Sequence, residues 1–428
     1  MNVAVAILFG TLFLLLLVGV PVAFALISAS LATVLYLGLP SVAVVLQTAA
    51  GASTASLIAI PLFVFAGELM MRGGISDRLI AFAAALVGKA RGGLAQINVL
   101  ASLFFGGVSG SAIADVSAIG GTMIPQMVNR GYDRDFAVNA SISAALVALL
   151  VPPSHNLILY SASAGGSISI ADLFAAGVVP ALLLTLALML TARIISGRRG
   201  YAAEGFPGWS ALLIRLVAAL PGLLLVALIF FGIRAGIFTA IESAAIAVGY
   251  ATLVTGVVYR KLDRALFLDA VRGAARTAGL ILFVIGAAAS FGWLLAYLQV
   301  PAAAVEFLTS VTDEKIGVLL LLNCMLLLLG TFMDLAPLII ICTPIFLPVA
   351  KAFGIDPVHF GIILVLNAGI GLITPPVGSV LFVGTAIGRI GVMQAVRSLW
   401  PFYLAGLAVL LAVNAFPQLS LWLPSLLK

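Results

Sequence analysis

Two pairs of consecutive prolines, Pro152-Pro153 and Pro375-Pro376, interrupt long apolar stretches of this chain. A proline has no backbone N–H and clashes with the carbonyl four residues before it, so each pair should free main-chain oxygens in the preceding turn. A hard cation such as Na⁺ prefers oxygen ligands of this kind. We therefore expect cation ligands among the carbonyls of four residues: Ala148, Leu149, Gly371 and Leu372.

Small polar side chains lie next to both proline pairs. Others lie in two earlier segments, at 106–115 and 329–337, where small or polar residues interrupt an apolar run; we call these segments breaks. A break combined with an interrupted helix occurs once in each half of the chain. This pattern predicts two cation sites with a solute pocket between them. Besides the four carbonyls, we expect the ion ligands to include six residues of the breaks and the proline segments: Ser109, Ser111, Pro152, Thr331, Thr374 and Pro375.

The composition requires a membrane. Of 428 residues, 63% are hydrophobic and 8% are charged, whereas soluble domains are about 25% charged. We expect one all-α integral membrane domain over 1–428, with crossings of about 20 residues each. The net charge of +6 is spread over the whole chain, so it forms no basic patch that could bind nucleic acid. Its partner is expected to be the lipid bilayer. Two Cys and two His form no spacing for a transition metal, so Na⁺ is the only metal predicted.

An internal repeat organises the chain. The first prolines of the two pairs differ in position by 375 − 152 = 223, and Pro125 and Pro348 differ by the same offset, 348 − 125 = 223. Internal symmetry of this kind is typical of secondary transporters. We predict repeat 1 at about 56–192, repeat 2 at about 279–415, and scaffold helices at 1–55 and 193–278.

Basic residues predict how each repeat lies in the membrane. Lys89 and Arg91 precede the first break and Arg130 follows it, so the positive-inside rule places both ends of this segment on one side. The segment should therefore be a re-entrant hairpin. In the second half the distribution is reversed, because the loop after the second hairpin carries only Lys351 whereas the next loop reaches Arg389. The two repeats should thus be inverted.

Four acidic residues fall in or near apolar segments, where a carboxylate is a functional candidate. For Glu68 we expect an ion pair with Arg72, four residues on. Asp115 and Asp334 begin second hairpin arms, where capping of a helix N-terminus and cation or proton coupling are equally supported. Glu242 is predicted to lie in mid-helix, bonded to neighbouring helices or engaged in transport.

Several motifs together resemble a known family. They are GGISDRL (73–79), SGSAIADVSAIGGTMIP (109–125), VPPSHNLILY (151–160), GIFTAIES (236–243) and LITPPVGSVLFVG (372–384). The combination, which covers essentially the whole chain, resembles the large, DctM-like membrane subunit of tripartite ATP-independent periplasmic (TRAP) transporters.

The resemblance implies a fold similar to elevator transporters, and a function without enzymatic activity. It implies Na⁺-driven uptake of organic anions, such as C4-dicarboxylates or sialic acid, across a bacterial inner membrane. A periplasmic binding protein would deliver the anion, and a small four-helix membrane subunit would come from a separate chain. The substrate contacts implied by the matching motifs are Gly110, Ser154, Asn156, Asp334, Gly378 and Ser379.

Three other functions compete with this prediction. A Na⁺- or H⁺-coupled anion carrier without a binding protein could share the hairpins, and so could an ion channel. An intramembrane serine protease would use Ser109 of a GxSG motif with His155 as its base. Such a protease needs no duplicated broken helix, so the repeat disfavours it.

Overall fold

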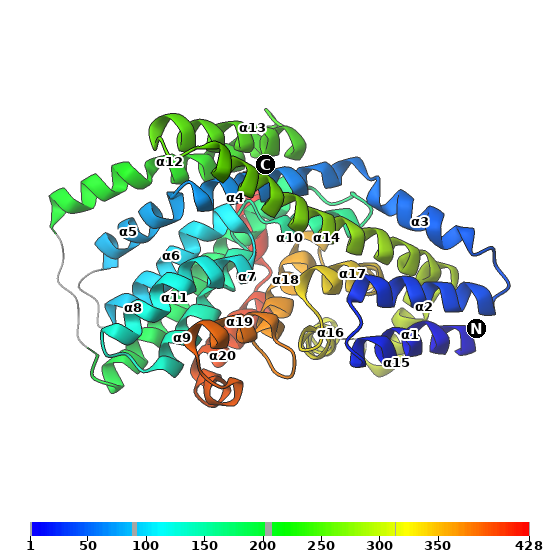
Figure 1. The fold of residues 1–428 in the computed structure, drawn as a ribbon. Helices are drawn as coiled ribbons and strands as arrows, with labels where there is room; N and C mark the ends of the chain where they lie inside the picture. The colour runs from blue at the N-terminus through cyan, green and yellow to red at the C-terminus, as the bar shows by residue number, and fades with distance from the viewer. Residues whose placement is uncertain (1, 88–91, 202–207, 313, 428) are drawn as a thin grey trace.

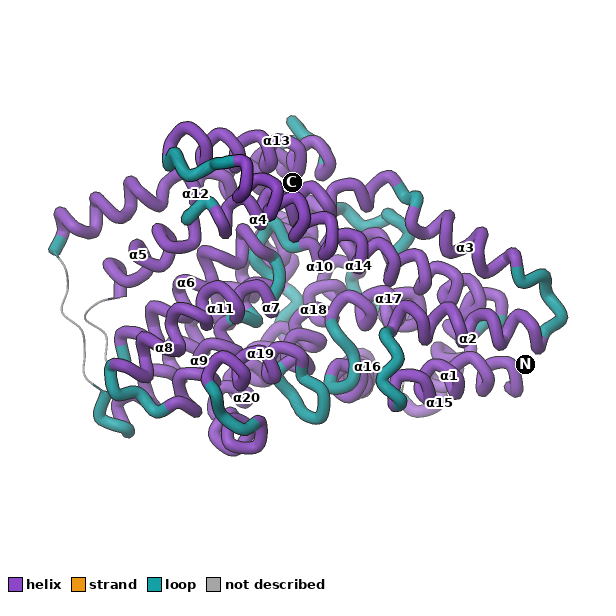
Figure 2. The backbone as a smooth tube through the Cα atoms, viewed as in Figure 1, coloured by secondary structure: helices purple, strands orange, loops and turns teal. Residues whose placement is uncertain are grey.

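The computed structural model describes residues 2–87, 92–201, 208–312 and 314–427, and these ranges are helical throughout with short connections (Figure 2). Within these ranges six helices are long and apolar enough to cross a membrane, and the bent pair α4 (Ala59–Arg72) and α5 (Ile75–Val87), at 68°, would add a seventh. The six are α11 (Ile170–Arg198), α12 (Trp209–Arg234), α13 with its π-helical end (Ala240–Val258), α14 (Arg264–Tyr297), α17 (Leu335–Ala352) and α20 (Val392–Ala415). The expected all-helical membrane protein is confirmed.

One group of helices forms a frame. The long helix α14 packs against α2 (Val22–Tyr36), α3 (Val42–Ala52) and α4, while α1 (Asn2–Leu17) covers α2 and α13 packs on α4 and α12. Small residues bring α3 and α14 together, since a Cβ on Gly51 would lie 2.2 Å from the Cβ of Ala289. In Figure 1 this group extends from α12 and α13 to the N-terminal helices.

The hairpins and the broken helices form a second group, which begins with the first hairpin. Helix α6 (Gly93–Ser109) is followed by Gly110, whose φ of 57° permits the chain to reverse. The return arm consists of α7 (Ala112–Asp115), a π-helical segment (Val116–Gly120) and α8 (Gly121–Asn129), and it packs along α6. The second hairpin consists of α16 (Lys315–Gly330) and α17, joined by residues 331–334. Lys89 and Arg91, used above to orient the first hairpin, lie outside the described residues.

Each hairpin is followed by a broken helix. The first comprises α9 (Arg134–Ala144), a 3₁₀ turn (Val147–Leu149) and α10 (His155–Ser163), and the second comprises α18 (Pro357–Leu372) and α19 (Ser379–Gly388). Both proline pairs are joined by cis peptide bonds within the breaks. The helix ends follow the offset of the proline pairs, because α9 and α18 begin at 134 and 357, and α8 and α17 end at 129 and 352.

Hairpin and broken helix touch through their main chains. A Cβ on Gly371 would lie 2.7 Å from the Cα of Gly330, and a Cβ on Gly106 would lie 2.6 Å from the Cα of Ala148. Under the offset of 223, Ala148 corresponds to Gly371, and Gly330 lies one residue beyond the position that corresponds to Gly106. The absence of larger side chains there allows each hairpin to lie directly against its broken helix.

The two halves also interlock. Helix α10 packs against α17 and α18, while α19 packs against α9 and the π-helical segment. The Tyr160 hydroxyl on α10 donates a hydrogen bond of 2.7 Å to the carbonyl of Pro357, at the start of α18. The remaining helices, α15 (Val300–Val311) and α21 (Gln418–Leu426), cover α17 and α11 respectively.

The prediction for Glu242 is wrong. Glu242 is the third residue of α13, not a mid-helix residue, and it is exposed. Its carboxylate accepts from the backbone N–H of Thr239 at 2.7 Å, while the Thr239 hydroxyl accepts from the N–H of Glu242 at 3.2 Å. This reciprocal capping box begins α13.

Candidate functional site

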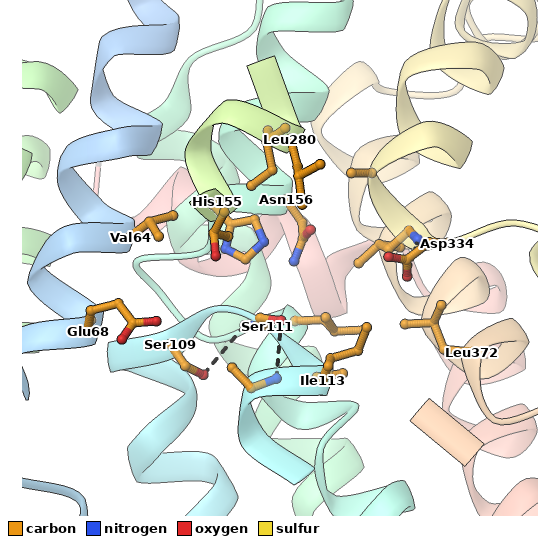
Figure 3. Close-up of a pocket in the computed structure, with 18 of the residues that line it drawn as sticks. Val64, Glu68, Ser109, Ser111, Ile113, His155, Asn156, Leu280, Asp334 and Leu372 are labelled. Carbon is orange, nitrogen blue, oxygen red and sulfur yellow. Dashed lines mark hydrogen bonds between the residues drawn. The ribbon is translucent and has the colours of Figure 1, made fainter. Parts of the chain in front are cut away.

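A cavity of about 440 Å³ lies where the frame meets the tips of both hairpins (Figure 3). Helices α4 and α14 form one wall, with Val64, Glu68 and Leu280. The first hairpin tip and the start of α10 also line the cavity, and the second hairpin tip contributes Asp334.

Six of the predicted site residues line this cavity: Ser109, Ser111, Leu149, Asn156, Asp334 and Leu372. The other ten are not among its lining residues: Gly110, Ala148, Pro152, Ser154, Thr331, Gly371, Thr374, Pro375, Gly378 and Ser379. Pro152 instead borders a second, apolar cavity of about 350 Å³ between α6, α11 and α12.

Three helix starts meet at the cavity. Its lining includes Ala112, His155 and Leu335, which are the first residues of α7, α10 and α17. Helix α7 continues through the π-helical segment into α8, so it begins a long helical arm as α17 does. N–H groups at a helix N-terminus carry partial positive charge and suit an anion. The lining contains no Lys or Arg among the described residues, and these helix starts are its positive groups.

The two hairpin tips have equivalent caps. Ser111 caps α7, its hydroxyl accepting from the N–H of Ala114 at 3.4 Å, and Asp334 caps α17, its carboxylate accepting from the N–H of Leu335 at 2.9 Å. The two caps are related by the same offset as the proline pairs. Of the two acids expected as possible caps, Asp334 is therefore one, whereas the cap of the first hairpin is Ser111 and Asp115 lies a turn further on.

The broken helices are tied to the tips by corresponding residues. The Asn156 amide donates to the carbonyl of Gly110 at 2.8 Å, and the Ser379 hydroxyl donates to the carboxylate of Asp334 at 3.2 Å. In the second half the N–H of Val377 also donates to the carbonyl of Thr331 at 3.1 Å. Tip and broken helix thus form one hydrogen-bonded unit in each half.

Two of the four carbonyls expected to be free accept hydrogen bonds from the protein. The Ser154 hydroxyl donates to the carbonyl of Leu149 at 2.6 Å, and the N–H of Thr374 donates to that of Gly371 at 2.9 Å. Each oxygen keeps a second lone pair for an ion. The hydroxyls of Thr331 and Thr374 donate within their own segments, to Leu328 and Ile370, both at 2.8 Å.

The frame supplies cavity residues that sequence reasoning did not place in the site. Glu68 lies on the wall and forms the expected ion pair with Arg72, at 2.9 Å between Oε2 and Nε. Thr277 on α14 lines the same wall. Their position depends on how α4 and α14 pack against the hairpins, so no local pattern could have indicated it.

The geometry does not assemble a serine protease. The His155 ring bonds to the backbone carbonyl of Ser109. The Ser109 hydroxyl accepts from the N–H of Ser111 at 3.5 Å. A Ser–His pair would instead need a ring nitrogen bonded to the serine hydroxyl.

Comparison with known proteins supports the assignment suggested by this architecture. The chain is 36% identical over 413 residues to the sialic acid TRAP transporter large permease protein SiaM of Vibrio cholerae, covering 96% of each chain. It is also 36% identical over 448 residues to the C4-dicarboxylate TRAP transporter large permease protein DctM of the same organism, covering 99% of this chain and 98% of that one.

A solved structure shares the fold. The YdaH transporter of Alcanivorax borkumensis, whose crystal structure was described as having an unusual topology, superposes with a TM-score of 0.61 at 16% identity. The match covers 89% of this chain and 87% of that one. The family model for the DctM component of tripartite ATP-independent periplasmic transporters matches residues 9–419. With six or more apolar helices and relatives named as transporter permeases, this chain belongs to the DctM family of TRAP transporter large subunits.

Proposed function

We propose that this chain carries out Na⁺-coupled uptake of a small carboxylate, such as a C4-dicarboxylate or sialic acid, across a bacterial inner membrane. A periplasmic binding protein delivers the anion, and a small four-helix membrane subunit completes the transporter. The relatives named for sialic acid and C4-dicarboxylates support this substrate class. The observation that carries the proposal is the meeting of three helix starts in one cavity.

The charge of the cavity supports coupling to a cation. Its lining holds the carboxylates of Glu68 and Asp334 and no Lys or Arg within the described residues. Of these two carboxylates only Glu68 has a paired cation in the described ranges, Arg72, so added positive charge near Asp334 favours the entry of an anion. Na⁺ bound at the tip and broken-helix oxygens supplies that charge, so sodium binding precedes and strengthens anion binding.

The arrangement of the two helix groups supports an elevator movement. The cavity lies between the frame helices α4 and α14 and the hairpin tips. Each tip is bonded to its broken helix, and the two broken helices interlock with opposite hairpins. The hairpins and broken helices then move as one inverted-repeat unit against the frame, carrying the anion and its sodium ions.

Reconstituted transport tests the proposal. Proteoliposomes containing both membrane subunits are supplied with the binding protein and a radiolabelled carboxylate, with an inward Na⁺ gradient or an equal K⁺ gradient. We expect uptake only with Na⁺ and binding protein. Uptake that proceeds equally without the binding protein would favour a simple anion carrier, and equal uptake with K⁺ would remove sodium coupling.

Two substitutions locate the sodium sites. Ser109→Ala and Thr374→Ala each remove one tip or broken-helix oxygen, and we expect the half-saturating Na⁺ concentration to rise in both. Ser163→Ala is the matched control, because its hydroxyl donates to its own helix at the far end of α10. Sodium dependence unchanged in both variants would exclude these side chains as ligands.

A further inference from the structure

Asp115 is a buried carboxylate that neither capping nor the cavity accounts for. It follows Ile113 and Ala114, which line the cavity, but its own side chain turns into the hairpin and is 1% exposed. The Ser102 hydroxyl on α6 donates to its Oδ2 at 2.7 Å. Its Oδ1 is buried and has no hydrogen-bond partner among the described residues.

Within the described part of the chain, the elements that pack most closely on α7 carry no positive charge. Helix α7 packs most closely against α6, the π-helical segment, the Val147–Leu149 turn and α19, and none of these four sequences contains an ionisable residue. The charged residues of α9, which packs against α6 and the π-helical segment, are engaged elsewhere, since Arg134 donates to the carbonyl of Gly388 and Asp135 pairs with Arg199. The His155 ring on α10 bonds to the carbonyl of Ser109.

A second buried oxygen lies on the same face of α6, one turn before Ser102. Asn98 is 0% exposed, and its amide nitrogen donates to the hydroxyl of Ser141 on α9. Its Oδ1 is also buried without a hydrogen-bond partner in the described part of the chain. The return arm is π-helical opposite this face, over Val116–Gly120, and such segments are frequent at functional sites. Two buried oxygens without a hydrogen-bond partner among the described residues, Asp115 Oδ1 and Asn98 Oδ1, thus belong to the arms of the first hairpin.

We propose that Asp115 binds a monovalent cation, a proton or Na⁺, inside the first hairpin and separately from the two tip sites. This inference rests on the proposed function, because it adds a third cation to the same transport cycle. An ionised carboxylate with one hydrogen bond and no counter-ion is strongly disfavoured in a dry interior. A bound cation removes that penalty and lets the two arms of the hairpin pack together below the tip.

The site has no counterpart in the second hairpin. Under the offset that relates the two halves, Asp115 corresponds to Leu338 and Ser102 corresponds to Met325. Cation binding at Asp115 therefore acts on one hairpin only, so the two tips respond differently to cation concentration.

Thermal unfolding of the purified membrane subunits in nanodiscs tests this proposal. The unfolding midpoint is measured at pH 6 and pH 8 over a NaCl series balanced with choline chloride, for the native protein, Asp115→Asn and Asp269→Asn. Asp269 is an exposed carboxylate paired with Arg272 on α14 and serves as the matched control.

Asp115→Asn supplies a neutral side chain of the same shape. If the cation is a proton, the native midpoint falls from pH 6 to pH 8 without Na⁺ and this difference disappears in Asp115→Asn. If the cation is Na⁺, the half-saturating concentration at pH 8 rises at least tenfold in this variant. Asp269→Asn should match the native protein in both respects.

The two proposals fail in different ways. Suppose that Na⁺ raises the unfolding midpoints of the native protein and Asp115→Asn equally, and that the midpoints of both change equally between pH 6 and pH 8. Asp115 is then not a cation site, although sodium coupling stands. If Na⁺ affects neither but Asp115→Asn loses the pH response, Asp115 binds a proton and sodium coupling fails. Should Asp115→Asn not fold, Ser102→Ala must shift the pH or Na⁺ response, and an unchanged response overturns the proposal.

Discussion

The side-chain amide of Asn156 donates a 2.8 Å hydrogen bond to the carbonyl of Gly110, joining the start of α10 to the turn of the first hairpin. Both residues are buried. The corresponding bond in the second half, from Ser379 to Asp334, is longer at 3.2 Å and exposed. The side-chain bond to the broken helix is therefore stronger at the first tip than at the second, whose other bond is between main chains, from Val377 to Thr331.

Asn156→Ala should weaken both stability and transport. The variant leaves the buried carbonyl of Gly110 without its donor, which costs about 1–3 kcal/mol. We expect a lower unfolding midpoint and slower uptake in proteoliposomes. Ser379→Ala is the comparison, and because its bond is long and exposed it should cost below about 0.5 kcal/mol. Equal effects of the two substitutions would contradict the asymmetry of the tips.

Gly371→Ala should separate the second hairpin from its broken helix. The added Cβ would lie 2.7 Å from the Cα of Gly330, and main-chain atoms cannot move aside as a flexible side chain can. We expect a loss of about 1–3 kcal/mol from overpacking. Gly249→Ala, in an exposed helical position with no atom within 4 Å, should instead be neutral or stabilising by up to about 1 kcal/mol. Thermal unfolding of the two variants measures the difference.

Glu68→Gln should change substrate affinity more than stability. The pair with Arg72 is of the i, i+4 kind and partly exposed, so its loss costs about 0.3–0.5 kcal/mol. Removing a negative charge from the cavity wall reduces repulsion of an anion, and we expect a lower KM for uptake. Arg72→Gln leaves Glu68 unneutralised and should raise KM. Both shifts should shrink at high salt, and KM values that move in the same direction would count against an anionic substrate.

Tyr160→Phe tests the link between the two halves. The Tyr160 hydroxyl donates to the carbonyl of Pro357 at 2.7 Å, and its loss should cost about 1–2 kcal/mol. Tyr297→Phe is the control, because Tyr297 is 54% exposed at the end of α14. We expect the unfolding midpoint to fall in the first variant alone. A midpoint that stays at the native value in Tyr160→Phe would mean that this bond adds nothing to the contact between α10 and α18.

Local chemistry explains why much of the architecture could be predicted. Proline pairs must interrupt helices wherever they fall, and the helix ends recur at the interval that separates the two pairs. The Glu68–Arg72 pair and the Asp334 cap depend on residues one to four positions apart, so the sequence contains the whole interaction. The capping box at Thr239 and Glu242 was equally local, and its spacing of three residues could have identified it.

Other features depend on packing that no local pattern contains. The donors to the carbonyls of Leu149 and Gly371 could not be foreseen from the rule that proline frees oxygens, because that rule does not say which group will replace the lost N–H. The entry of Glu68 and Thr277 into the cavity wall depends on contacts between the frame and the hairpins. Whether Asp115 would cap its helix or face inward depended on Ser111, which occupies the capping position first.

The backbone contact between Gly330 and Gly371 restricts where a gate can bend. Since the main chains of α16 and α18 meet there with no side chain between them, α16 cannot move away from α18 without leaving a void. Any opening of the second hairpin must therefore pivot above Gly330, within the short connection at 331–334. An opening confined to these four residues is large enough for a small solute to pass but too small for a polymer.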